Sequence, residues 1–145
     1  MRASALGDHI DLAAYGEFRA GLLKHIAMEE KVLLPAAQES QGGLRLRAAE
    51  RLRLDHGALA ALIVPTPTPA IVATIQRILR EHNRIEEGRG GVYEVCEKLV
   101  GSNLDDLLSR LRAVPAVSVA SYKDGPLVMA AARRALIRAG YSLDL

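Results

Sequence analysis

The 145-residue sequence has little of what marks a secreted or membrane protein. Its single cysteine, Cys96, cannot form an internal disulfide. Its apolar runs are short or broken by charge and proline, far below the roughly 20 residues that span a bilayer. The N-terminal stretch MRASALGDHI has no apolar run of signal-peptide length. We therefore expect a cytoplasmic protein without membrane contact.

Aromatic residues and excess charge are also scarce. Aromatic residues make up 3% of the chain, and 19 basic residues face 17 acidic ones, for a formal net charge of +2. Four arginines do cluster: Arg45, Arg47, Arg51 and Arg53. However, Glu50 and Asp55 interrupt this cluster, and no aromatic side chain lies within it to stack on bases. A solvated helix face is the better interpretation, and we expect no nucleic-acid partner.

What the sequence does contain is enough apolar residues for one core. With 50% hydrophobic and 25% charged residues, the chain fits a single domain, 1–145, that buries about two thirds of its unfolded surface.

Apolar residues recur at steps of three and four along three segments, which is the pattern of one helix face. The three stripes are Tyr15, Phe18, Leu22, His25, Glu29 and Val32; Ala49, Leu52, His56, Leu59 and Ile63; and Ile71, Ile75, Ile78, His82 and Glu86. We expect the first helix to end at Pro35 and Gly42–Gly43, the second at VPTPTPA and the third at EEGRGG.

The rest of the chain also favours helices. VYEVCEKLV should resume the third helix, and Ser102 or Asn103 could cap a short helix through Leu111. AVSVASY is either a brief extended segment or a loop packed on the bundle, and a last helix should run from Leu127 to Ala139. No strand pattern supports a sheet, so the sequence predicts a small all-α bundle.

The pattern His-x-x-x-Glu occurs twice, as His25–Glu29 and His82–Glu86. Positions i and i+4 lie on the same helix face, about 6 Å apart along the axis, so one metal centre can take both side chains. His56 adds a third imidazole from another helix. Burying these groups without a partner would cost several kcal/mol, whereas a cation neutralises the carboxylates and uses the imidazole lone pairs.

Plainer interpretations exist for each part of this set. A His–Glu pair at i,i+4 is more often a surface pair, and a lone core histidine is usually only hydrogen-bonded. Two identical pairs and one histidine on three apolar stripes together favour a shared site of His25, Glu29, His56, His82 and Glu86. Glu30 and Glu87 lie one position off the stripes, where they face solvent or act as outer acceptors. A structural bundle that has lost its metal is a further alternative.

These segments resemble the hemerythrin-like domains with HHE cation-binding motifs. The likeness lies in FRAGLLKHIAMEEKVLLP, LRLDHGALAALI and ILREHNRIEE, covers roughly residues 11–100, and leaves 101–145 as an extension packing on the bundle. It implies an antiparallel four-helix bundle with two irons, bridged by the motif glutamates and terminally bound by the histidines. Activities of such proteins include O2 binding, oxygen or iron sensing, and handling of nitric oxide or peroxide.

The N-terminus departs from this family, whose members usually have a further histidine on a preceding helix. His9 is the candidate here. If Asp11 caps a helix unbroken through Glu30, His9 is about 24 Å from His25 along the axis and cannot share its metal. If the chain reverses at Gly16, the two histidines could meet. The first geometry leaves the family's first helix missing, to be replaced by the C-terminal helix or by a second subunit of a homodimer.

The ligand types fit iron best, with manganese or zinc as alternatives, and one metal ion instead of two also remains possible. Three histidines and two glutamates cannot saturate two six-coordinate irons, which leaves positions for oxo or hydroxo bridges, water and a small ligand. We therefore expect a non-heme iron protein that binds or reacts with O2, peroxide or nitric oxide. The alternative is a metal-gated sensor or interaction module without turnover, so enzymatic activity stays open.

Overall fold

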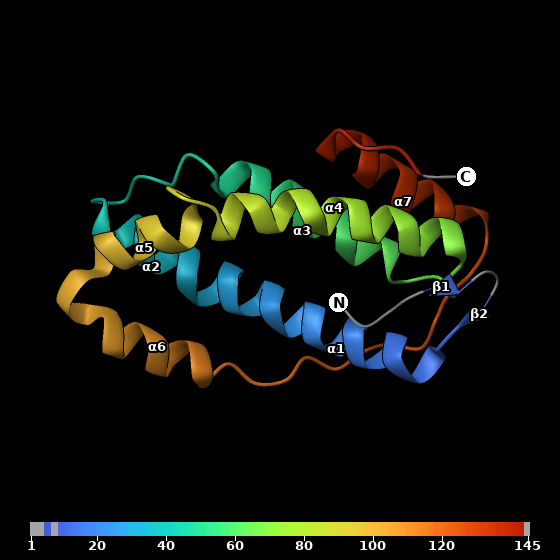
Figure 1. The fold of residues 1–145 in the computed structure, drawn as a ribbon, viewed down its shortest axis with the longest axis horizontal. Helices are drawn as coiled ribbons and strands as arrows, with labels where there is room; N and C mark the ends of the chain where they lie inside the picture. The colour runs from blue at the N-terminus through green and yellow to red at the C-terminus, as the bar shows by residue number, and fades with distance from the viewer. Residues whose placement is uncertain (1–4, 7–8, 144–145) are drawn as a thin grey trace.

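Helices account for nearly all the regular structure of the chain, which confirms the predicted all-α bundle (Figure 1). The computed structural model describes residues 5–6 and 9–143. The α-helices are α1 (Leu12–Met28), α2 (Leu34–Ser40), α3 (Ala49–Leu62), α4 (Pro69–Glu87), α5 (Val92–Val100), α6 (Leu104–Arg112) and α7 (Pro126–Ala139). A π-helical turn, η1 (Glu29–Leu33), joins α1 to α2, and a 3-10 turn, η2 (Gly101–Asn103), precedes α6. Two short antiparallel strands, β1 (Ala5–Leu6) and β2 (His9–Ile10), are an addition that the sequence did not predict.

Local sequence signals set several helix ends. The Asp11 carboxylate accepts a hydrogen bond from the Ala14 amide at 3.0 Å and caps α1. The Thr68 hydroxyl accepts one from the Ile71 amide at 3.2 Å, and Pro69 follows at the first turn of α4. Gly140 ends α7 in the left-handed conformation, with φ of 86°. The helix predicted over Leu127–Ala139 is confirmed.

Of the two expected ends of the first helix, Pro35 is wrong and Gly42–Gly43 is confirmed. The chain stays helical from Leu12 to Ser40, and the glycines at 42 and 43 end it. In a regular α-helix the ring of Pro35 would crowd the Lys31 carbonyl. The π-helical turn widens the helix at this point, which is consistent with the proline being tolerated.

Four long helices, α1, α3, α4 and α7, surround the larger apolar core. In Figure 1, α3 runs opposite to α1, α4 and α7. The first core contains Tyr15, Leu22, Ala58, Leu59, Leu62, Ile63, Ile71, Val72, Ile75, Ile78, Ala132, Leu136 and Ala139. Since α7 supplies three of these residues, the C-terminal helix is the fourth helix of the bundle.

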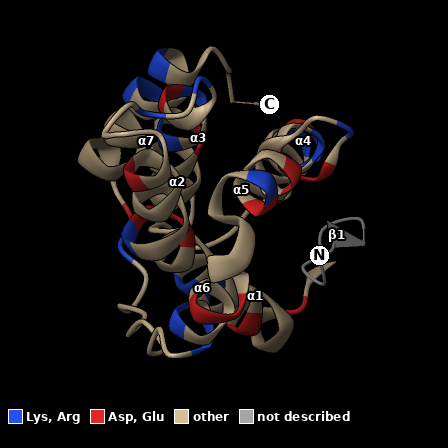
Figure 2. Cartoon of the chain, turned by 90° about the vertical axis from the view of Figure 1, so that its left-hand side faces the viewer, with Lys and Arg blue, Asp and Glu red and all other residues tan. Residues whose placement is uncertain are grey.

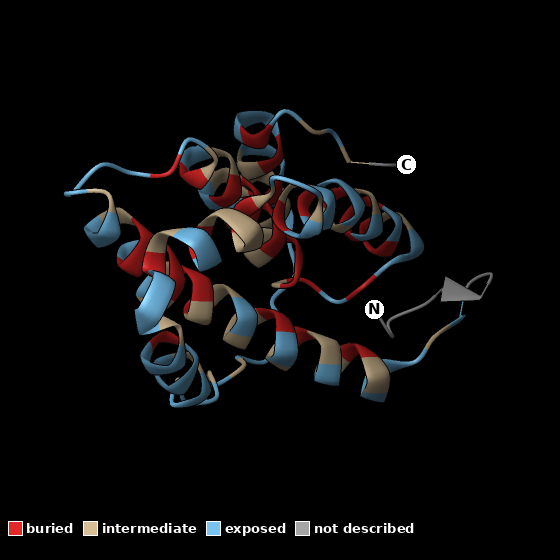
Figure 3. Ribbon diagram, turned by 60° about the vertical axis from the view of Figure 1, so that its left-hand side comes forward, coloured by how far each residue is buried: buried red, intermediate tan, exposed pale blue. Residues whose placement is uncertain are grey.

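A second core lies at the other end of the molecule, where α2, α5 and α6 gather (Figure 1). Its buried members are Leu33, Leu34, Ala36, Ala37, Leu46, Ala49, Leu52, Val92, Cys96, Val100 and Leu107. Buried residues line the inner helix faces around both cores (Figure 3). Along α3, Leu52 belongs to the second core and Leu59 to the first, so His56 sits where the two cores meet.

The segment 113–125 is an extended loop packed on the bundle, one of the two predicted outcomes. Arg19 donates a hydrogen bond to the Ala120 carbonyl at 2.9 Å and lies over the Tyr122 ring. The Lys123 amide donates to the Val64 carbonyl at 3.0 Å. These contacts hold the path between α6 and α7 against the helices.

Along the helices that the structure describes, acidic and basic residues alternate without a large patch of either charge (Figure 2). Among residues 5–6 and 9–143, every helix is too short or too polar to cross a membrane.

Candidate metal centre

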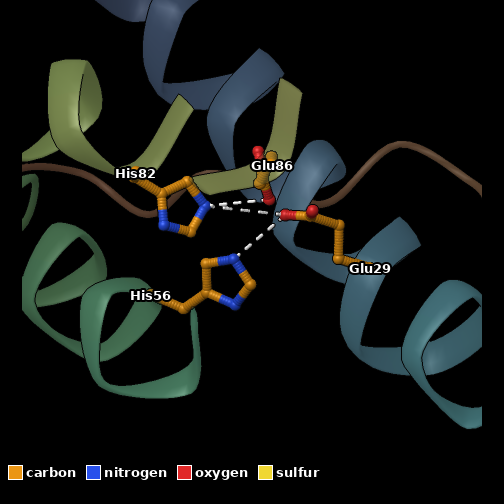
Figure 4. Close-up of side chains that lie close together, drawn as sticks. All are labelled: Glu29, His56, His82 and Glu86. Atoms are coloured by element: carbon orange, nitrogen blue, oxygen red, sulfur yellow. Dashed lines mark hydrogen bonds and ion pairs between the residues drawn. The ribbon is translucent and has the colours of Figure 1, made fainter. Parts of the chain in front are cut away.

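Four buried side chains from three helical segments converge between the two cores (Figure 4). They are Glu29 of η1, His56 of α3, and His82 and Glu86 of α4. One potential ligand atom from each lies within 4.8 Å of the others, and no residue in this group is more than 4% exposed. Two imidazoles and two carboxylates at this spacing could hold a metal ion. We call these four residues the central cluster.

Glu30 fixes the orientation of His56. The Nδ1 atom of His56 lies 2.8 Å from Oε1 of Glu30, while its Nε2 atom lies 3.0 Å from Oε1 of Glu29. One ring nitrogen is therefore held from outside the central cluster, and the other is directed into it.

Asp55 holds His82 in the same way. The Nδ1 atom of His82 lies 3.1 Å from Oδ2 of Asp55, a fully buried carboxylate that also accepts a hydrogen bond from Arg51 at 2.8 Å. The Nε2 atom of His82 faces Oε2 of Glu86 at 3.0 Å, yet the two atoms are not aligned as a hydrogen bond. Neither atom has another hydrogen-bond partner among the described residues. Such buried, convergent and unsatisfied ligand atoms suit a cation placed between them.

The π-helical turn explains how two adjacent glutamates reach one histidine. Consecutive residues of a regular α-helix point about 100° apart, so only one of them normally faces a given neighbour. Here the Leu34 amide bonds to the Glu29 carbonyl, five residues back, and the helix is widened over Glu29–Leu33. Glu29 and Glu30 consequently contact the two nitrogens of the same His56 ring. Glu87, the equivalent residue on α4, is exposed.

His25 lies at the edge of the central cluster and not in the interior, which corrects our expectation that it is buried. Its side chain is 46% exposed, and its Nε2 atom lies 3.2 Å from Glu29 Oε1 and 3.6 Å from Glu86 Oε1. The buried face of α1 includes Tyr15, Arg19 and Leu22. We had expected Phe18 on this buried face, but Arg19 is buried there. The buried face of α1 is therefore turned away from His25.

Tyr93 is a site residue that the sequence analysis missed. Its hydroxyl lies 3.1 Å from His25 Nε2, 3.0 Å from Glu86 Oε1 and 3.3 Å from Glu29 Oε2. Tyr93 reaches this position because the chain turns sharply between α4 and α5. A Cβ atom on Gly91 would lie 2.6 Å from the Ile85 carbonyl oxygen, so only glycine fits this turn without a shift. The glycines of EEGRGG were a signal for the turn, but not for the tyrosine beyond it.

The charges of the site balance one another. Hydrogen bonds to Glu29 and Glu86 raise the pKa of His25 to about 10. Burial by itself would lower the pKa of His82, but Asp55, Glu29 and Glu86 outweigh it and raise the value to about 11. Burial would likewise raise the pKa of Glu29, but the three histidines hold it well below its usual range. Without a metal, His25 and His82 are therefore cations that neutralise the carboxylates.

His9 lies apart from this arrangement. The helix predicted to start after Asp11 runs unbroken through Met28, and the alternative reversal at Gly16 is wrong. His9 lies in β2, before α1, and at a rise of about 1.5 Å per residue the helix from Leu12 to His25 alone spans about 20 Å. The end of the molecule that carries β2 is distant from η1 (Figure 1).

Comparison with known proteins places the chain in no family. No protein-family model matches it, and neither does any curated protein or solved structure. The resemblance to hemerythrin-like domains therefore rests on the three motifs alone.

Proposed function

We propose that this protein binds iron, in one or two ions, and that the iron centre binds or reacts with a small oxidant such as O2, peroxide or nitric oxide. The kinship with hemerythrin-like domains is part of the same proposal. His25, Glu29, His56, His82 and Glu86 are the proposed ligands. Mixed imidazole and carboxylate ligands favour iron, with manganese and zinc as the alternatives.

One observation carries the metal proposal. Both buried imidazoles have Nδ1 against an outer carboxylate, Glu30 or Asp55, and both direct Nε2 into the central cluster. Outer carboxylates of this kind fix the tautomer of a metal-binding histidine and raise its basicity. A cation at the point where these groups converge would also satisfy Nε2 of His82 and Oε2 of Glu86, which have no hydrogen-bond partner among the described residues.

The residues of the chain have separate tasks in this proposal. Glu29 and Glu86 supply negative charge, and His56 and His82 supply imidazole nitrogen ligands, which for His82 requires loss of its proton. His25 and Tyr93 lie at the more open side, where an arriving small ligand would compete with Glu86 for the hydrogen bond that the Tyr93 hydroxyl donates at 3.0 Å. Bound iron would supply electrons to the oxidant.

Metal analysis of protein made in iron-supplemented cells tests the proposal, with absorption spectra recorded before and after exposure to air. We expect bound iron and a spectrum that changes with oxidant. His56→Ala should remove most of the metal, whereas the exposed control Glu87→Ala should retain it. Full occupancy in His56→Ala would refute the site. Bound metal without an oxidant response, but with a metal-dependent change of helix packing, would favour the sensor alternative.

A further inference from the structure

A mainly apolar cavity of about 410 Å³ adjoins the central cluster. Four leucines of α6 line it: Leu104, Leu107, Leu108 and Leu111. His25, Glu29 and Tyr93 line it as well; polar atoms of the first two lie within 3.3 Å of the Tyr93 hydroxyl, and we call these three residues its polar end. The volume lies within the range of small-molecule sites, about 300–1,000 Å³.

The sequence of α6 accounts for the apolar wall. The four leucines fall at steps of three, one and three, which places them on one helix face, while Asp105, Asp106 and Arg110 occupy the remainder. Of these leucines only Leu107 is buried, and Leu108 is 37% exposed. The apolar face of α6 thus remains partly uncovered directly above the cavity.

The polar end of the cavity selects the head group of an occupant. The Tyr93 hydroxyl and His25 Nε2 lie 3.1 Å apart, and Glu29 Oε2 lies 3.3 Å from the same hydroxyl. The lining has two carboxylates, Glu29 and Glu97, and one imidazole, His25, which is already paired with Glu29 at 3.2 Å, so an anionic head group is disfavoured. A neutral hydroxyl can donate to the Glu29 carboxylate and accept from Tyr93 or His25.

We propose that this cavity binds a neutral, mainly apolar organic molecule with one hydroxyl group, which lies against His25, Glu29 and Tyr93. The cavity shares His25 and Glu29 with the proposed metal centre, so the site is tested in metal-free protein, where no ion engages these two side chains. A small molecule fits better than a second copy of the chain, because the polar groups lie at the end of a concave cavity and not on a flat face.

The neutral fluorophore N-phenyl-1-naphthylamine, titrated into metal-free protein, provides the test. We expect a saturable rise in fluorescence that 1-decanol reverses at a concentration at least tenfold lower than decanoate. Equal competition by the alcohol and the acid would overturn the assignment of a neutral head group. Absence of saturable binding, of the probe and of 1-decanol by calorimetry, would overturn the site itself.

Two matched leucine variants locate the probe. Leu108→Glu places a charge in the cavity wall and should weaken binding at least tenfold. Leu44→Glu changes a leucine that is 72% exposed and lies outside the cavity, so binding should be unchanged. Equal binding by both variants would mean that the probe sits elsewhere and would refute the proposal.

Self-association that Leu108→Glu abolishes, without probe binding, would instead show that a second copy covers the cavity and would also refute the proposal. Because metal is omitted, failure here leaves the iron proposal intact, and failure to bind iron leaves this one intact.

Discussion

Oε1 of Glu30 lies 2.8 Å from Nδ1 of His56, on the side of the ring that faces away from the central cluster. The contact exists because η1 brings two consecutive glutamates to one imidazole. Glu87 occupies the corresponding motif position on α4, but it is exposed. Two residues that look equivalent in sequence therefore have different structural roles.

Glu30→Gln should accordingly weaken metal binding about 10- to 100-fold, the usual effect of losing an outer partner of a metal-binding histidine. The amide preserves size but removes the charge that stabilises the His56 ring. Glu87→Gln makes the same chemical change at an exposed position and should bind metal as the natural protein does. Competition titration with a chromogenic chelator measures both, and equal affinities would contradict the role of Glu30.

His25 of α1 and His9 of β2 should differ in the same assay. His25→Ala should reduce metal content sharply, because Nε2 of His25 lies 3.2 Å from Glu29. His9→Ala should leave it nearly unchanged. If both substitutions remove the metal equally, His9 belongs to the ligand set and the centre is less open than we propose.

Stability should depend on pH in opposite ways with and without metal. The folded-state pKa values of His25 and His82, about 10 and about 11, lie above the ordinary 6.5. In metal-free protein, the stabilisation that these two protonated histidines give the folded state is therefore complete below pH 6.5. It is lost as pH rises through about 10 for His25 and about 11 for His82. Glu29 has a lowered pKa, so its contribution is present above its ordinary value of 4.5 and is lost in acid. Metal-free protein should therefore have its highest free energy of unfolding between pH 4.5 and pH 6.5, the ordinary pKa values of glutamate and histidine.

Metal binding requires the histidines to lose their protons, so it strengthens as pH rises. The difference in melting temperature between metal-loaded and chelator-treated protein should therefore grow from pH 6 to pH 9. Differential scanning fluorimetry across this range measures it. Identical melting curves for the two forms would show that the metal lies outside the core.

Gly91 offers a test of the turn that positions Tyr93. Gly91→Ala would place a Cβ atom 2.6 Å from the Ile85 carbonyl oxygen, so the turn must shift and Tyr93 must move from Glu86. We expect a loss of about 1–3 kcal/mol in the free energy of unfolding and an altered metal spectrum. Gly57→Ala is the control, since this helical position has open space and alanine should stabilise it by roughly 0.5–1 kcal/mol. Chemical denaturation compares the two, and equal stability would contradict the steric argument.

Sequence periodicity predicted α3 and α4 well. Every stripe residue from Ala49 to Ile63 and from Ile71 to Glu86 is buried, including the histidines. On both helices the buried face is continuous, so a simple period of 3.6 residues describes it.

The same reasoning failed on α1 because a charged residue lies on its buried face. Arg19 is 7% exposed and contacts Ala120 and Tyr122, which lie 101 or more residues along the chain. The π-helical turn then changes the period within the same helix. Neither effect is visible in a pattern of apolar residues.

Two further site residues depend on tertiary structure. Asp55 precedes His56 but binds His82 of another helix, and Tyr93 reaches the central cluster only through the turn at Gly91. The sequence indicates which candidate ligands share a helix. It does not indicate which side chains of neighbouring helices contact them, because those contacts depend on how the helices pack.

The position of the central cluster between the two cores has a consequence for cooperativity. Leu52 and Leu59 pack into different cores on either side of His56, so a layer of polar groups interrupts the apolar contact between the ends of the molecule. In amide hydrogen exchange, we expect α2, α5 and α6 of the metal-free protein to open as a unit while α3, α4 and α7 stay protected. A bound ion would join both ends through Glu29, His56 and His82 and make the molecule unfold as one.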